Sequence, residues 1–351
     1  MVPNSLVIGP KRGDVLVPDN NNRSSYLTML QLIKQYWYLG WWFVRARFFG
    51  RKAPLQTVLF ITDKCNLKCK HCSVYDVVGS KHRAFKDIVA DLQYSYDLGS
   101  RFLDLEGGET TLWKEGDKNL NDIIEAAKKI GFFSVTITTN AQQDFSWVAM
   151  DSLWVSMDGV GKYHEAVRGE GTFARLEKNI KLFHESRKSK RAPLTVNMVV
   201  NKLNIDGLEE ALEYAKSNPS IAQISINFHT PFPGTEQLML DDEQKTQALD
   251  TVIRYKRKGY PIMNSVSGLK KMYPKYMQTH NVGSLCWVTN FVYPTGDRGL
   301  CVGIQTELLN GRLSYTPTDT CKHCGFCMSG EMASVFHFCP DTLLAGLKLR
   351  M

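Results

Sequence analysis

Short apolar runs recur through the middle of the chain, and charged segments with helical periodicity separate them. Runs of β-branched and apolar residues bounded by polar or turn residues predict buried strands. The segments between them, such as 121–131 and 174–186, predict amphipathic helices. The predicted strands cover residues 57–62, 102–109, 134–140, 153–159, 194–200 and 223–229. This alternation predicts a parallel α/β sheet or barrel.

Both ends of the chain depart from this alternation. Residues 1–25 are rich in Pro, Asn and Gly and predict an irregular arm, whereas residues 26–50 are crowded with aromatic side chains and predict a helix. The alternation weakens after residue 236. We therefore expect an arm with an aromatic, basic helix, a core barrel, a helical connection and a small cysteine-rich domain, over residues 1–55, 56–235, 236–280 and 281–351.

The aromatic segment, residues 26–52, ends in a cluster of arginine and lysine residues. Its uncharged stretch, Tyr36–Val44, is far shorter than the roughly 20 apolar residues that a transmembrane helix needs, so we do not expect it to span a bilayer. Three roles stay open: packing on the protein's own core, which we favour, peripheral contact with a membrane surface, and binding of an apolar substrate.

Composition and charge exclude little. Charged residues make up 22% of the chain and hydrophobic residues 43%, as in an ordinary globular protein. The net charge of +8 suits an anionic partner but does not select one. Because no compact basic stripe with interleaved aromatic residues reaches the cysteines, we expect no nucleic-acid partner. The N-terminal segment lacks the pattern of a secretory signal, so we expect a cytoplasmic location, with membrane association left open.

The nine cysteines fall into two groups. Three lie between residues 65 and 72, six lie between 286 and 339, and residues 73–285 contain none. A disulfide framework would spread cysteines through a small secreted domain, whereas metal sites concentrate them. We therefore expect two metal-binding regions.

The first group is spaced C-x3-C-x2-C and comprises Cys65, Cys69 and Cys72. A structural zinc site needs four ligands, and His71 lies between two of the cysteines, where it is poorly placed to be the fourth. Iron–sulfur clusters are held by about one cysteine thiolate per iron, so three cysteines leave one iron of a [4Fe–4S] cluster open. An open coordination position lets a metal bind and activate a substrate.

Polar motifs follow the predicted strands, where an α/β barrel carries its chemistry. In this context the cysteine loop resembles that of the radical S-adenosylmethionine (radical SAM) superfamily, and the resemblance covers about residues 56–235. Four further motifs carry the resemblance. Glu106-Gly107-Gly108-Glu109 resembles the family's GGE motif, and Thr139-Asn140 resembles its T-N-G turn, with Ala141 in place of Gly. Ser156-Met157-Asp158-Gly159 resembles its S-x-D-G element, and the segment His164–Phe173, with Arg168, resembles the segment that follows that element.

The resemblance implies a partial (β/α)6 TIM-like barrel, an open [4Fe–4S] cluster on the first cysteine group, and bound S-adenosyl-L-methionine. In the family, the GGE motif meets the methionine amino group, the S-x-D-G element contacts the ribose, and an arginine often reaches the carboxylate. A reduced flavodoxin- or ferredoxin-type donor supplies an electron, and the resulting 5′-deoxyadenosyl radical removes hydrogen from the substrate. The residues implied in cofactor binding are His71, Glu106, Gly107, Gly108, Glu109, Asn140, Ser156, Asp158 and Arg168.

The second group resembles a SPASM or twitch domain, which carries auxiliary [4Fe–4S] clusters. The spacing C-x9-G-x4-C from Cys286 to Cys301 is similar to the opening of SPASM, but the later cysteines depart from its pattern. Three alternatives remain for this region: one auxiliary cluster, two auxiliary clusters, or a zinc ribbon, which we disfavour. The ligands we expect are Cys286, Cys301, Cys321, Cys324, Cys327 and Cys339; His323 and His337 are expected to be bystanders.

The leading function is that of a radical SAM enzyme with an unidentified substrate, which could be a peptide, a protein or a small or apolar molecule. The alternative is a non-enzymatic iron–sulfur protein for electron transfer or cluster assembly. The GGE-like and S-x-D-G-like motifs favour the enzyme, because the alternative gives them no role.

Overall fold

The computed structural model describes residues 20–75, 78–189, 192–280, 282–299, 301, 307–309, 312–314 and 319–348. The chain divides into two compact units, Met1–Phe49 and Gly50–Met351. Residues 1–19 of the predicted arm lie outside the described residues.

The first unit contains one helix, α1 (Asn20–Phe48), in its described part. This helix begins earlier than predicted: residues 20–25 were expected to be irregular, but they are helical. No proline or glycine lies between Asn20 and Ser25, so nothing there interrupts the addition of helical turns. In the described residues, no helix combines the length and the apolar character that crossing a membrane would need.

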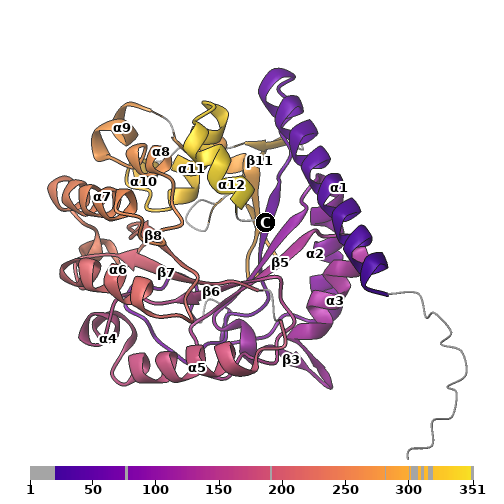
Figure 1. Cartoon of the computed structure of the whole chain (residues 1–351), viewed down its shortest axis with the longest axis horizontal. Coiled ribbons are helices and arrows are strands. Elements are labelled where there is room, and N and C mark those ends of the chain that lie inside the picture. Colours follow the sequence, from indigo (N-terminus) through magenta and orange to yellow (C-terminus); the bar gives the residue numbers. More distant parts are fainter. Residues whose placement is uncertain are drawn as a thin grey trace, which may run out of the picture. The chain divides into compact units, whose positions relative to one another are not determined.

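The second unit is built on a sheet that has eight strands in the described part of the chain, in the order β10-β9-β1-β2-β5-β6-β7-β8. From β1 to β8 all neighbours are parallel. Figure 1 shows these strands curving into an open barrel with helices outside. The predicted strands are confirmed as β1 (Gln56–Phe60), β2 (Phe102–Glu106), β5 (Ser134–Thr139), β6 (Ser152–Ser156), β7 (Leu194–Val200) and β8 (Gln223–Phe228).

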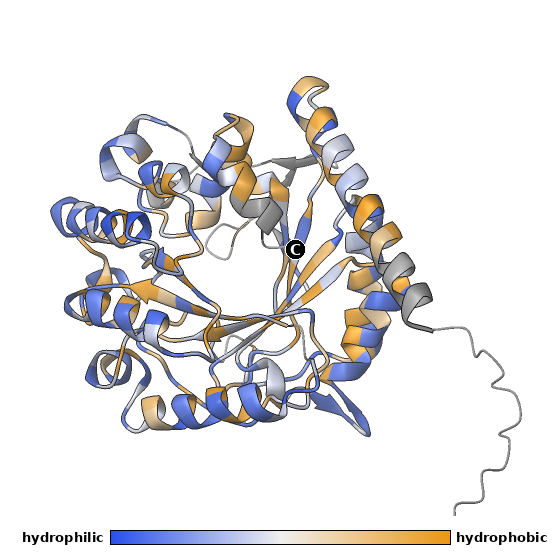
Figure 2. Cartoon of the chain, viewed as in Figure 1, coloured by the Kyte–Doolittle hydropathy of each residue, from blue (hydrophilic) through white to orange (hydrophobic). Residues whose placement is uncertain are grey.

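Most connections between these strands are helical, as the charge pattern predicted; the segment from β5 to β6 has no helix, and α7 follows β8. The apolar faces of the helices bury residues such as Ile88, Ile123 and Leu176 against the outward-facing residues of the strands. Figure 2 shows the apolar residues gathered on the strands and the polar residues on the outer helices. The helices are α2 (Phe85–Leu98), α3 (Leu120–Ile130), α4 (Lys162–Arg168), α5 (Thr172–Ser186), α6 (Leu208–Ser217) and α7 (Asp242–Arg257).

The inner face of the sheet is polar. On β2, Leu103 and Leu105 are fully buried toward the helices, so Asp104 and Glu106 face inward, because successive side chains alternate between the two faces. Hydrogen bonds join neighbouring strands on this face, for example Asn227 to Asn197 at 2.7 Å. A barrel interior is more often filled with branched apolar side chains. We call this inner face the polar lumen.

The C-terminal part of the chain extends the sheet and covers its edges. Strand β9 (Thr289–Val292) pairs in parallel with β1, and β10 (Arg298–Gly299) pairs antiparallel with β9, so the boundary expected at residue 281 does not coincide with an end of the sheet. Helix α11 (Cys327–Phe336) packs against β8 at one edge and against η4 (Val282–Val288), which leads into β9, near the other. The later cysteines are thereby brought to the barrel.

Candidate functional site

The first cysteine loop is anchored by the glycine pair that follows β2. The Gly108 amide donates to the Thr62 carbonyl at 2.8 Å, and the Glu109 amide donates to the Lys64 carbonyl at 2.9 Å. A Cβ atom on Gly108 would lie 2.4 Å from the Lys64 carbonyl oxygen. Only glycine permits this approach. The close partner of the glycines is therefore the backbone that enters the cysteine loop.

Glu109 joins this turn to the end of β5. It is 2% exposed and accepts hydrogen bonds from Thr111, from the Thr139 hydroxyl and from the Asn140 amide. In turn, Asn140 Nδ2 donates to Asn66 at 2.7 Å and lies 3.6 Å from Cys65 Sγ. The ends of β2 and β5 thus both contact the cysteine loop.

Ala141, which stands where the radical SAM pattern has glycine, adopts the left-handed conformation with φ of 57°. A residue other than glycine pays roughly 1–2 kcal/mol for this conformation. Asn179 donates to the Ala141 carbonyl at 2.9 Å and holds the turn in place. The turn therefore keeps the backbone form that glycine would favour, despite the substitution.

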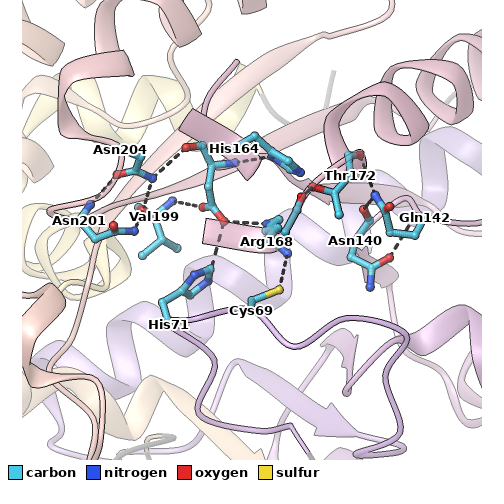
Figure 3. A network of polar contacts seen from close by, with 12 residues as sticks. Cys69, His71, Asn140, Gln142, His164, Arg168, Thr172, Val199, Asn201 and Asn204 are labelled. Carbon is cyan, nitrogen blue, oxygen red and sulfur yellow. Dashed lines mark hydrogen bonds and ion pairs between the residues drawn. The ribbon is translucent and has the colours of Figure 1, made fainter. Parts of the chain in front are cut away.

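Asp158, just beyond β6, is the centre of a buried polar network. Figure 3 shows members of this network, among them His71, Arg168 and Asn204. It is fully buried, and its carboxylate accepts from Arg168 Nε at 2.7 Å and from the Val199 amide at 3.0 Å. Arg168 Nη1 lies 3.7 Å from Cys69 Sγ. Burial disfavours the charged form of Asp158, but the Arg168 charge outweighs it and holds the pKa of the carboxyl below its usual range. The pair connects β6 and α4 to the cysteine loop.

Two histidines flank Asp158, and both are neutral near pH 7. His71 Nε2 lies 3.9 Å from an Asp158 oxygen, and burial lowers the pKa of His71 to about 4. His164 Nδ1 accepts the Asp158 amide at 3.2 Å, and burial lowers the pKa of His164 to about 3. His71 Nδ1 and His164 Nε2 have no hydrogen-bond partner among the residues that the structure describes.

The polar lumen carries two carboxyl groups with raised pKa values. Burial raises the pKa of Glu106 to about 8 and that of Asp104 to about 6. Thr138 donates to Glu106 at 2.7 Å, and Gln56 donates to Asp104. Within the described ranges, neither carboxyl group has a lysine, arginine or histidine at ion-pair distance. Ser156, also predicted, is half-buried at the end of β6.

Sequence reasoning missed Asn201 and Asn204, which follow β7 and support Asp158. Asn204 Nδ2 donates to the Asp158 carbonyl at 2.8 Å and to the Val199 carbonyl at 3.0 Å. The Asn201 backbone amide donates to Asn204 Oδ1 at 2.7 Å and orients that side chain. The available signal was their position just after a predicted strand, where polar residues of a barrel gather.

The second cysteine group meets the carboxyl end of β8. The Phe228 amide donates to the Gly325 carbonyl at 2.9 Å, and the Cys327 amide donates to Asn227 Oδ1 at 2.9 Å. A Cβ atom on Gly325 would lie 1.6 Å from the Phe228 carbonyl oxygen, so no other residue fits. Since the strands are parallel, the loop Cys324–Cys327 lies at the end of the barrel that also carries the first cysteine loop.

The remaining cysteines separate into near and far positions. Cys286 lies in η4, which packs against α10 (Asp319–Lys322), where Cys321 lies, and against α11. Cys301 follows the β9–β10 hairpin, as Cys286 precedes it. By contrast, Cys339 lies beyond the other end of the ten-residue helix α11 from Cys327, a helix length of about 15 Å. Within the described residues, no three Cys, His, Asp or Glu side chains converge on a single metal ion.

Comparison with known proteins finds one matching family and several similar sequences. Residues 59–215 match the Radical SAM superfamily. A "Probable GTP 3',8-cyclase" of Saccharolobus islandicus (strain L.S.2.15 / Lassen #1) is 26% identical over 180 residues, 48% of this chain and 55% of that protein. A protein of the same name from Methanococcus vannielii is 26% identical over 176 residues, 47% of this chain and 56% of that protein. The chain spans about half the length of these curated relatives.

Solved structures share the fold. The structure of Streptococcus suis SuiB bound to precursor peptide SuiA has a TM-score of 0.58 at 17% identity, covering 85% of this chain and 69% of SuiB. Native anSMEcpe with bound AdoMet and Kp18Cys peptide has a TM-score of 0.55 at 18% identity, covering 71% of this chain and 74% of anSMEcpe. These likenesses concern the fold.

Proposed function

Residues 59–215 form a radical SAM domain, and on that premise we propose that the chain is an enzyme that reductively cleaves S-adenosylmethionine and abstracts hydrogen from a polar substrate. The observation that carries this proposal is that the glycine turn after β2 and the Asp158–Arg168 pair both contact the first cysteine loop at the carboxyl ends of the strands. A non-enzymatic iron–sulfur protein would need the cysteines but not the network around them.

Cys65, Cys69 and Cys72 suit a cluster by the chemistry of their thiols. Burial raises the pKa of Cys65 to about 11 and also raises the pKa of Cys69. Such thiolates form only beside a positive partner, and iron is one. When bound, a [4Fe–4S] cluster and S-adenosylmethionine supply the electron and the 5′-deoxyadenosyl radical that removes hydrogen from the substrate. The contact from Arg168 favours the thiolate of Cys69.

For the methionine amino group we propose Glu106 as the carboxylate partner. Glu109 is surrounded by protein donors, whereas Glu106 faces the polar lumen with one neutral donor, Thr138. A cation would stabilise the charged form of Glu106, whose pKa burial raises. We also propose that Ser156 and Asp158 contact the ribose, that His71 packs by the adenine and that Arg168 reaches the carboxylate. Asn140 is a further proposed contact, and Gly107 and Gly108 hold the turn.

We propose that the second cysteine group holds an auxiliary [4Fe–4S] cluster, with Cys286, Cys321, Cys324 and Cys327 as ligands. They belong to elements that pack against one another, and the half-buried Cys324 and the buried Cys327 lie beside the end of β8. We keep Cys301, which follows the β9–β10 hairpin, as an alternative ligand. Cys339 lies apart from the other cysteines. It would serve as a ligand if the chain held a second auxiliary cluster.

The polar lumen supports a substrate with hydrogen-bonding groups. Asn197, Asn227 and Asp104 line it and offer hydrogen-bonding groups to a substrate. A peptide fits this description as well as a small polar molecule does. The reductant proposed is a flavodoxin- or ferredoxin-type donor in the cytoplasm.

Peripheral membrane contact through residues 26–52 is a separate proposal. In the first unit, Ile33, Trp37, Trp41 and Phe48 are more than half exposed and, at spacings of four, four and seven, share one face of α1. Aromatic and basic residues together suit an anionic lipid surface. We expect the chain to sediment with phosphatidylglycerol vesicles and the variant Trp37→Asn to lose this binding. Equal recovery of the chain in the pellet with and without vesicles would contradict the proposal.

The decisive experiment for the enzyme uses the anaerobically reconstituted chain. Iron and zinc are counted, S-adenosylmethionine and dithionite are added, and 5′-deoxyadenosine is measured by chromatography. We expect iron at both cysteine groups and formation of 5′-deoxyadenosine. An iron-replete protein that forms none would refute the enzyme and leave the electron-transfer or scaffold alternative.

A further inference from the structure

A buried lysine lies beside the second cysteine group. Lys245, on α7, is 8% exposed, although lysine is seldom buried without a partner of opposite charge. Its Nζ donates to the Cys324 carbonyl at 3.2 Å, lies 3.5 Å from Met277 Sδ and stands 5.5 Å from the centre of the Phe228 ring. No carboxylate of the described residues is at ion-pair distance from it.

The position of Lys245 in its helix adds to the cost of its charge. It is the fourth residue of α7, and Figure 2 shows this helix as mainly hydrophilic, so a lysine is ordinary there but burial is not. The amino end of a helix carries a partial positive charge, which disfavours a cation. Asp242 and Glu243 occupy the first turn, and Asp242 favours the charged form of Lys245, but neither carboxylate lies at ion-pair distance from the Lys245 Nζ. A buried ammonium without a counter-charge is strongly destabilising.

The groups that can supply the missing negative charge are the cysteines. The Lys245 ammonium donates to the carbonyl of Cys324, so its charge lies beside the loop that carries the thiols of Cys324 and Cys327. Thiolates bound to an iron–sulfur cluster would give this corner of the fold a net negative charge, and charge near a cluster is one of the properties that set its potential.

We propose that Lys245 is the counter-cation of an auxiliary iron–sulfur cluster on Cys324 and Cys327, and that its charge raises the reduction potential of that cluster. This rests on the proposed function, since it requires the second cysteine group to hold iron. Lys245 would act through its charge and not as a ligand. It contacts the ligand loop at the Cys324 carbonyl, and its positive charge favours the reduced, more negative state of the cluster.

The test removes the first cluster and measures the second. In the full chain with Cys65, Cys69 and Cys72 all changed to Ala, auxiliary iron is counted and its potential is measured by a redox titration followed by electron paramagnetic resonance. Lys245→Met, Lys245→Arg and the exposed control Lys258→Met are compared. Lys258 lies just after α7, so its loss removes the same charge outside the buried site.

We expect Lys245→Met to lower the ratio of reduced to oxidised cluster at least tenfold at a fixed ambient potential, equivalent to about 59 mV for one electron. Lys245→Arg and Lys258→Met should stay near the parent. Loss of iron from Lys245→Met with retention in Lys245→Arg also supports the counter-charge. An unchanged potential in Lys245→Met, or equal loss of iron from both Lys245 variants, overturns it while the cluster itself stands. Absence of auxiliary iron from the parent overturns the cluster, and the inference with it.

Discussion

The guanidinium of Arg168 lies 3.7 Å from the sulfur of Cys69, so a residue from the helix after β6 reaches the cysteine loop after β1. The same side chain donates to the buried Asp158 at 2.7 Å. A second tie, from the Lys70 amide to the Val167 carbonyl at 3.0 Å, holds α4 against the loop. Arg168 therefore couples the shape of the loop to the buried carboxylate.

Replacing Arg168 should destabilise the fold. Arg168→Met leaves Asp158 as a buried, unpaired carboxylate, and breaking such a pair costs about 3–5 kcal/mol. Denaturant unfolding of the cluster-free chain measures the free energy of unfolding. The double variant Arg168→Met with Asp158→Asn should recover most of the loss, because it removes the stranded charge. A double variant no more stable than the single would show that the pair's charge is not the cause.

Glu106 should make the cluster-free protein less stable as pH rises. Its folded pKa of about 8 exceeds its ordinary value of 4.5, so its contribution to stability is complete below about pH 4.5 and is lost as pH rises through about 8. Glu106→Gln should remove this trend and gain stability relative to the parent across that interval. Urea unfolding over a pH series checks it, with the exposed Glu125→Gln as control. Parallel pH curves for parent and Glu106→Gln would contradict the assignment.

Gly325→Ala should detach the Cys324–Cys327 loop from β8. Its Cβ would overlap the Phe228 carbonyl oxygen, and overpacking of this kind costs about 1–3 kcal/mol or more. We expect loss of auxiliary iron and retention of iron at the first cysteine loop, measured by iron content and electron paramagnetic resonance. Gly40→Ala, whose Cβ meets nothing within 4 Å, is the matched control. Full iron content in Gly325→Ala would show that the docking is dispensable.

The two cysteine groups should separate functionally. Cys69→Ala should abolish formation of 5′-deoxyadenosine, since it removes a proposed ligand of the open cluster. Cys324→Ala should leave the first cluster intact, because its ligands come from another loop. Iron counts and chromatography of the products check both. Cleavage retained by Cys69→Ala would refute the assignment of the first loop.

Cys339 and Cys327 should differ although both belong to the second group. The length of α11 separates them, and Lys271 Nζ, 3.8 Å away, is the neighbour of the Cys339 sulfur. Cys339→Ala should therefore keep the auxiliary iron that Cys327→Ala loses. Equal iron loss in the two variants would mean that the cluster is ligated across the helix, against the packing of the fold.

The sequence by itself determined the barrel and predicted where its first site lies. Alternating apolar runs predicted the strands, because a parallel strand covered by helices must bury its outward residues. The spacing of Cys65, Cys69 and Cys72 and the motifs at strand ends predicted where chemistry would gather, since local order along the chain fixes both. The start of α1 was missed, because Asn- and Ser-rich segments suit a loop as well as a helix end.

Only the tertiary structure decided what these residues touch. It gave Gly108 a backbone partner at Lys64, Asp158 a guanidinium from Arg168 and support from Asn204, and Cys324 a buried lysine from α7. These partners are distant in sequence, and charge compensation and close backbone approach depend on distances in space. A pattern along one chain records residue types and spacing, but it carries no such distances.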